Sequence, residues 1–108
     1  MDELEQARTE GSAKVGFDGA GVPVIKLIGE IDISNVDALR AEIEPVILRA
    51  PDRVVFDLGA LDFIDSSGIA LLLFAASHVG SVHLYQPSML VRRVIELTGL
   101  ADVLHIEP

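Results

Sequence analysis

Two adjacent serines, Ser66 and Ser67, directly follow Asp65 and could carry the chemistry of this chain. A serine hydroxyl can accept a phosphate, act as a nucleophile or cap the first N–H groups of a helix. An apolar strand-like run, residues 54–58, precedes the serines and an apolar segment, residues 69–76, follows them, so a helix should begin at this turn. A phosphate on Ser66 would meet unpaired N–H groups and the positive end of the helix dipole. Because capping serines are common, the residues alone favour a cap over a phosphate acceptor.

A catalytic serine finds little support in the rest of the sequence. The turn at Asp65 lacks the G-x-S-x-G spacing of a hydrolase nucleophile elbow, and His78, His83 and His105 are scattered along the chain. No two histidines have a metal-ligand spacing such as H-x-x-x-H, and the chain has no cysteine. No glycine-rich phosphate-binding loop is present. We therefore expect no catalytic residue, no metal and no cofactor.

Asp57 raises a second alternative, a phosphate-accepting aspartate. The run that contains it resembles the strand that presents the acceptor aspartate of response-regulator receiver domains. Such domains also need an acidic pair after their first strand and a lysine late in the chain. The only lysines here are Lys14 and Lys26, both early. We interpret Asp57 as a strand-end residue that hydrogen-bonds the following turn.

Composition limits the classes of partner. The chain has 108 residues, enough for one domain, and half of them are hydrophobic. Its net charge of −9 repels the phosphates of nucleic acids and anionic lipids. No apolar run reaches the roughly 20 residues that span a bilayer, and the acidic start does not resemble a signal peptide. We expect a cytoplasmic protein that binds neither nucleic acid nor membrane.

Strand-like and helix-like segments alternate along the chain. The expected strands are residues 14–18, 23–29, 53–58, 81–85 and 103–106. The expected helices start near Ser34, Ser66 and Met89. The first two strands should form a hairpin, and the others a parallel sheet joined by helices. The prediction is a single α/β domain over residues 13–108, with a mixed four- to five-stranded sheet, about three to four helices and a flexible tail at residues 1–12.

Capping residues suggest where the helices begin and end. Ser34 is expected to cap the first helix, with Asp37 completing the cap three residues later. Pro45 should kink that helix or end it early, because proline removes a backbone donor and clashes with the preceding turn. In the last helix, Ser88 should cap the start and Gly99 should provide a left-handed end.

The segment after the two serines is more apolar than one core-facing helix requires. One inward stripe would consist of Ile69, Leu72, Leu73 and Ala76. The remaining apolar residues, Ala70, Leu71 and Phe74, would meet either another part of the chain or a partner. In the last helix, the expected buried residues are Leu90, Val91, Val94, Ile95 and Leu97.

Several motifs, in this order, resemble the STAS domain of bacterial anti-sigma-factor antagonists. The resemblance extends from about residue 14 to residue 106 and has its most specific elements in the Asp-Ser-Ser-Gly turn and the later Leu-Thr-Gly-Leu. The motifs are Gly29-Glu30-Ile31-Asp32, Val55-Phe56-Asp57-Leu58, Phe63-Ile64-Asp65-Ser66-Ser67-Gly68-Ile69 with Leu71-Leu72, and Leu97-Thr98-Gly99-Leu100.

The resemblance implies a regulatory protein that is not an enzyme. It would bind an anti-sigma factor that has serine kinase activity and so free a sigma factor. Phosphorylation of Ser66, with Ser67 as the rival acceptor, would switch it off, and a phosphatase would restore it.

The resemblance and the charge of a phosphate together imply a binding surface around the turn. Asp65 would position the turn, Ser67 and Gly68 would let the kinase approach closely, and Asp32 would belong to an adjoining loop. The full expected surface is Asp32, Asp62, Asp65, Ser66, Ser67, Gly68, Ala70, Leu71 and Phe74. Two residues depart from the family pattern: many members have glycine at the position of Ala70, and Pro45 is unusual.

An alternative keeps the fold and changes the role. A STAS domain that is never phosphorylated could serve as a scaffold or accessory subunit in a stress-signalling assembly or a lipid-transport complex. The Asp65-Ser66-Ser67-Gly68 turn favours the phosphorylation switch.

Overall fold

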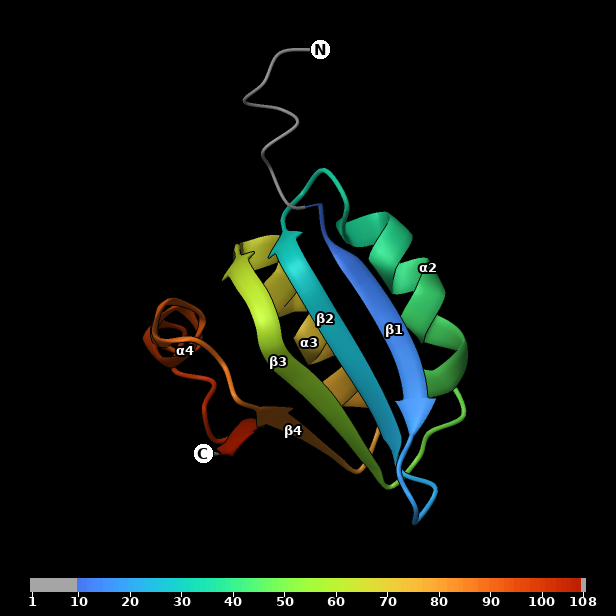
Figure 1. The fold of residues 1–108 in the computed structure, drawn as a ribbon. Helices are drawn as coiled ribbons and strands as arrows, with labels where there is room; N and C mark the ends of the chain where they lie inside the picture. The colour runs from blue at the N-terminus through green and yellow to red at the C-terminus, as the bar shows by residue number, and fades with distance from the viewer. Residues whose placement is uncertain (1–9, 108) are drawn as a thin grey trace.

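The computed structural model describes residues 10–107. Over these residues the chain forms one five-stranded mixed sheet and three helices, which confirms the predicted α/β fold (Figure 1). The elements are β1 Ser12–Phe17, β2 Pro23–Ile31, α2 Val36–Ile47, β3 Arg53–Ile64, α3 Ser66–His78, β4 Ser81–Tyr85, α4 Met89–Leu97 and β5 Leu104–Glu107.

The strands lie in the sheet in chain order, β1-β2-β3-β4-β5. β1 and β2 form the expected antiparallel hairpin, and the pairs from β2 to β5 are parallel. Ile31 pairs with Ile64, so β2 and β3 end side by side. The loop after β2 and the turn after β3 are therefore neighbours, as expected at the carboxyl ends of adjacent parallel strands.

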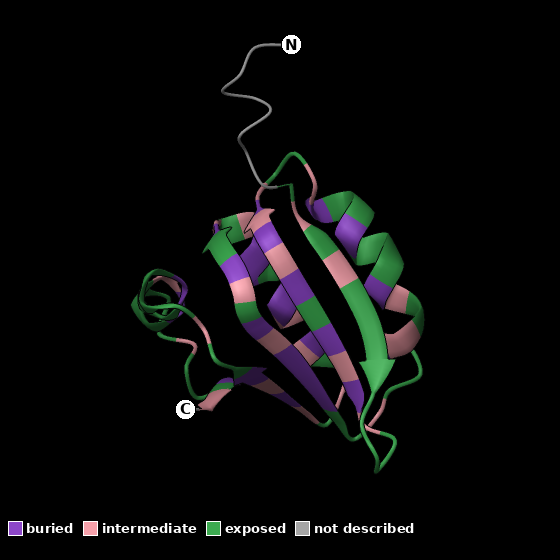
Figure 2. Cartoon of the chain, in the orientation of Figure 1, coloured by how far each residue is buried: buried purple, intermediate pink, exposed green. Residues whose placement is uncertain are grey.

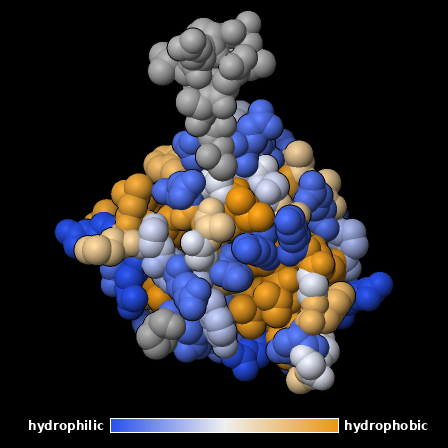
Figure 3. Space-filling model, in the orientation of Figure 1, coloured by the Kyte–Doolittle hydropathy of each residue, from blue (hydrophilic) through white to orange (hydrophobic). Residues whose placement is uncertain are grey.

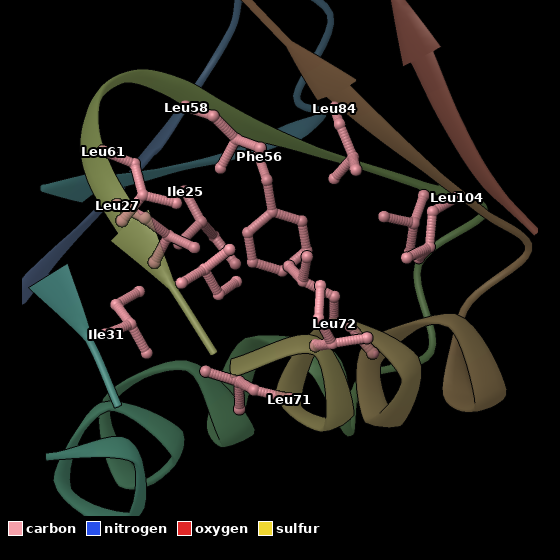
Figure 4. Close-up of a cluster of buried hydrophobic side chains, with 14 of the residues drawn as sticks. Ile25, Leu27, Ile31, Phe56, Leu58, Leu61, Leu71, Leu72, Leu84 and Leu104 are labelled. Carbon is pink, nitrogen blue, oxygen red and sulfur yellow. The ribbon is translucent and has the colours of Figure 1, made fainter. Parts of the chain in front are cut away.

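The core lies between the sheet and helices α2 and α3, which cover the same face (Figure 1). Buried and more exposed residues alternate along β2, since successive side chains of a strand point to opposite faces (Figure 2). Phe56 points from β3 into the centre of the apolar cluster, toward Leu72 of α3 (Figure 4). None of the buried residues described is polar or charged, so the hydrophobic effect dominates this interface.

β3 is longer than the expected strand at residues 53–58. It continues through an irregularity in its pairing with β2 and ends at Ile64. Asp57 therefore lies within the strand, not at its end, although its carboxylate accepts a hydrogen bond from the Gly59 N–H at 2.9 Å. β4 pairs only with the first part of β3, from Arg53 to Asp57. Helix α4 packs against β3, beside the part that β4 leaves unpaired (Figure 1).

In α2, the predicted cap and the expected early end at Pro45 were wrong. Asn35, not Ser34, precedes the helix, and it makes no side-chain capping bond, while the Ser34 hydroxyl donates to Asp32. Pro45 does not end the helix, which continues to Ile47. Burial of the apolar side of α2 stabilises the helix by more than the loss of the hydrogen bond that proline cannot donate destabilises it.

The domain also begins earlier than expected. β1 starts at Ser12, and Glu10 forms an isolated bridge with Glu30 of β2. The rest of the predicted tail, residues 1–9, lies outside the described residues.

Helix α4 has the predicted caps and a different buried side. The Ser88 hydroxyl accepts from the Val91 N–H at 3.2 Å, and Gly99 is left-handed at φ +75°. Val91 and Ile95 are buried and Val94 is half-buried. Leu90 and Leu97, both expected in the core, are exposed. The helix packs mainly against β3, and one narrow stripe of its residues is enough to cover that part of the strand.

Candidate functional site

Asp65 organises the turn between β3 and α3. Its carboxylate oxygen Oδ1 accepts hydrogen bonds from the N–H groups of Ser67 at 2.9 Å and Gly68 at 3.2 Å. Its own N–H donates to the carbonyl of Ile31 at 3.2 Å, which ties the turn to the end of β2. Asp65 is thus the N-cap of α3, and its charge also favours the positive helix end.

The same contacts set the ionisation of Asp65. Burial of the carboxyl group raises its pKa, and four hydrogen bonds, the largest from the Ser67 hydroxyl, oppose this effect. The others come from the backbone of Gly68, Ser67 and Ile33. The hydrogen bonds outweigh burial, so the pKa of Asp65 lies below its usual range and the side chain is ionised at neutral pH.

The two serines have different environments. The Ser67 hydroxyl donates to Oδ1 of Asp65 at 2.5 Å and is half-buried. Ser66 is exposed, and its hydroxyl makes no hydrogen bond with any residue from 10 to 107. Ser66 is therefore the hydroxyl that an outside group can reach without breaking a contact.

Acidic residues lie at or near the ends of the two strands next to the turn that carries Ser66. Asp32 follows β2, and Asp65 follows β3, at neighbouring strand ends because Ile31 pairs with Ile64. Oδ1 of Asp32 accepts from the Ser34 N–H at 2.9 Å. Asp62 is exposed near the end of β3. The fold thus gathers three of the predicted acidic residues at one end of the sheet.

Gly68 is buried, so the expectation that it lets a kinase approach is wrong. A Cβ at this position would lie 2.4 Å from Cγ1 of Ile64 and 3.1 Å from Cγ2 of Ile31. Glycine is needed here because α3 starts directly against the ends of β2 and β3.

Leu71 is not part of an exposed docking face. Only 3% of its surface is accessible, because α2 lies beside α3 on the same face of the sheet and packs against it (Figure 4). Ala70 is exposed, and Phe74 is half-buried beneath the guanidinium of Arg40, whose carbon lies 4.0 Å from the ring centre. The buried residues of α3 are Gly68, Ile69, Leu71, Leu72 and Ala75, while Leu73 and Ala76 are only half-buried.

A shallow groove of about 180 Å³ lies between α2 and α3 and begins at Ser67. Its lining residues are Val36, Asp37, Arg40, Ser67, Ala70 and Leu71. The residues from α2 were missed by the sequence reasoning. The sequence shows that α2 has an exposed polar side, but it does not indicate that this side lies beside Ser67.

Two of the three histidines are closer than their sequence positions suggest. The rings of His83 and His105 stack with centres 5.1 Å apart, because β4 and β5 pair in register. His83 also contacts Glu107 at 2.9 Å and the Ser81 hydroxyl at 3.0 Å. Neither histidine contacts Ser66.

Among residues 10–107, no group of three or more suitable side chains could hold a metal. None of the helices in the same range has the length and hydrophobicity needed to span a bilayer.

The sequence profile of the STAS domain matches residues 16–108. This chain belongs to the STAS domain family. The anti-sigma F factor antagonist of Lysinibacillus sphaericus is 34% identical over 82 residues, covering 71% of this STAS chain and 70% of the relative.

Solved structures of similar proteins agree with this fold. An anti-sigma factor antagonist from Mycobacterium paratuberculosis has a TM-score of 0.82 and 30% identity, covering 92% of this chain and 86% of that one. The phosphorylated form of SpoIIAA from Bacillus has a TM-score of 0.68 and 27% identity, covering 90% and 92%. This STAS protein thus groups with non-enzymatic regulators, as predicted.

Proposed function

We propose that this STAS protein is an anti-sigma-factor antagonist that is switched off by phosphorylation of Ser66. In its unphosphorylated form it binds an anti-sigma factor with serine kinase activity and releases a sigma factor. The observation that carries the proposal is the exposed hydroxyl of Ser66, which no residue from 10 to 107 bonds, compared with the Asp65-bonded hydroxyl of Ser67. The related SpoIIAA, which is known in a phosphorylated form, supports the same type of switch.

The charges at the site explain how phosphate would expel a partner. A phosphoserine carries about −1.5 to −2 charges at neutral pH. At Ser66 it would lie beside the ionised Asp65 and close to the neighbouring strand end that carries Asp32. A kinase surface that accommodates the hydroxyl would face this added charge, and like charges in an interface cost several kcal/mol. The partner therefore leaves.

The location of Ser66 should allow phosphorylation without destabilising the fold. Ser66 is the first residue of α3, where backbone N–H groups and the helix dipole favour negative charge. Its hydroxyl makes no hydrogen bond that phosphorylation would break within the described part of the chain. The switch thus changes binding while the core stays intact.

The proposed binding surface surrounds Ser66 on the ends of β2 and β3 and the start of α3. Its accessible members are Asp32, Asp62, Asp65, Ser66, Ser67, Ala70 and Phe74, with Arg40 added from α2. Gly68 and Leu71, which are buried, shape this surface from below. A phosphatase would reset the switch, and we place the cycle in the cytoplasm of a bacterium, in a stress response.

Mass spectrometry after incubation with candidate anti-sigma kinases and ATP tests the proposal. We expect one phosphate, on Ser66, and loss of kinase binding once it is attached. Ser66→Ala should prevent the modification, whereas Ser67→Ala is the matched control that should retain it. If no cognate kinase modifies either serine, the proposal fails and the unphosphorylated scaffold is favoured.

A further inference from the structure

The exposed side of α4 carries apolar residues that the fold leaves uncovered. Met89, Leu90 and Leu97 are 90%, 54% and 77% exposed. With Arg93 they form a continuous row, because residues three, four, seven and eight apart share one side of a helix. We call these four residues the α4 row. Val91 and Ile95, which bind the helix to the core, lie on the opposite side.

Arg93 lies in the middle of the row. It makes no ion pair or hydrogen bond within residues 10–107. Arg92, its neighbour, is directed elsewhere and pairs with Glu96 at 3.8 Å. A protein of net charge −9 therefore presents an unpaired positive group between exposed leucine and methionine side chains. In Figure 3, hydrophobic and hydrophilic surfaces adjoin on the flank where Figure 1 places α4.

Two kinds of occupant fit this row poorly. In a symmetric dimer with antiparallel α4 helices, Arg93 at the centre would face Arg93 of the second copy, a like-charge contact. An anionic membrane would bring many negative charges to a protein of net charge −9 and be repelled, whereas a segment with a single carboxylate brings one. A segment that covers the leucines and also neutralises Arg93 must be apolar and carry a carboxylate.

We propose that the α4 row is a docking surface for a partner protein segment with apolar residues around an acidic one. The row and the proposed switch belong to different elements, since the row lies on α4, which packs against β3, and Ser66 begins α3. The row is proposed to bind its partner whether or not Ser66 is phosphorylated.

Selection from a display library of random peptides of about 12 residues, long enough for three helical turns, tests the proposal on the full chain. We expect the enriched peptides to carry Asp or Glu between apolar residues and to shift the NMR signals of the α4 row. Arg93→Glu should weaken their binding about tenfold, the loss of one interfacial charge pair. Changing the acidic peptide residue to lysine should restore binding to that variant.

The matched control is Arg92→Glu, which makes the same change of charge outside the row and should leave binding within about twofold, as expected for a rim charge. Leu97→Ser, at an exposed position, should weaken binding without unfolding the chain. Peptides that carry no acidic residue, that bind Arg93→Glu as well as the parent, or that shift signals elsewhere would overturn the proposal. So would an empty selection, or self-association of the chain through the row.

Discussion

The Ser67 hydroxyl donates to Oδ1 of Asp65 at 2.5 Å, the same oxygen that caps the N–H groups of Ser67 and Gly68. One carboxylate thus immobilises one serine and leaves its neighbour, Ser66, unbonded within the described chain. Two adjacent residues of the same type acquire different roles, because one hydroxyl is part of the cap and the other makes no hydrogen bond with the described residues.

Removing each serine hydroxyl should therefore have different effects on stability. Ser67→Ala should lower the free energy of unfolding by about 1–2 kcal/mol, since it removes a hydrogen bond to a charged group. Ser66→Ala should change it by less than about 0.5 kcal/mol, as for an exposed side chain without contacts. Urea denaturation of the two variants measures the difference. Equal losses would show that Ser67 is not the residue bound to Asp65.

The contribution of Asp65 should depend on pH. Asp65→Ala should destabilise the protein by about 1 kcal/mol at neutral pH, because it removes an N-cap. The pKa of Asp65 is lowered by folding, so the ionised group stabilises the fold above the ordinary value of 3.8, and this stabilisation is lost as the pH falls through the lowered value. The difference in the free energy of unfolding between parent and variant should thus become smaller only in acid. Denaturation from pH 7 to pH 2 measures it, and a gap that widens in acid would contradict the assignment.

Gly68→Ala should destabilise the protein although alanine is the better helix former. The added Cβ would lie 2.4 Å from Cγ1 of Ile64 in a packed core. We expect a net loss of about 1–2 kcal/mol, since overpacking outweighs the gain in helix propensity. Gly19→Ala is the control, because no atom lies within 4 Å of its added Cβ. A Gly68→Ala protein that melts above the parent in a thermal scan would refute the close packing.

Substitutions at Leu71 and Phe74 should differ in their effect on the stability of the protein. Leu71→Ala should cost about 2–5 kcal/mol, as for a buried leucine, so a charged residue at this position would unfold the protein before it tested any interface. Phe74→Ala should cost less, because its ring is only half-buried at the margin of the core, where it also contacts Arg40 and His78. Calorimetric melting measures the stability of the two variants, and titration with the kinase then measures their binding. A Leu71→Ala protein with parental stability would restore the exposed docking face that the structure rejects.

Part of this architecture could be predicted because its causes are local. Ser88 and Gly99 mark the ends of α4 through contacts within a few residues, and the alternation around Val82 and Leu84 marks a strand. The length of β3 was missed, since Gly59 interrupts the β pattern and only the pairing with β2 continues it. The buried side of α3 was partly missed because an all-apolar segment has no periodicity to interpret.

By itself the sequence determined that Asp65 and two serines begin a helix, and that the motifs around them are those of a STAS domain. Capping needs only neighbours in the chain, so this part did not depend on the fold. Only the tertiary structure decided that α2 covers Leu71, that Gly68 is a packing residue and that the α4 row stays exposed. Burial is decided by elements distant in sequence, and a helix carries no local sign of which of its sides another helix will cover.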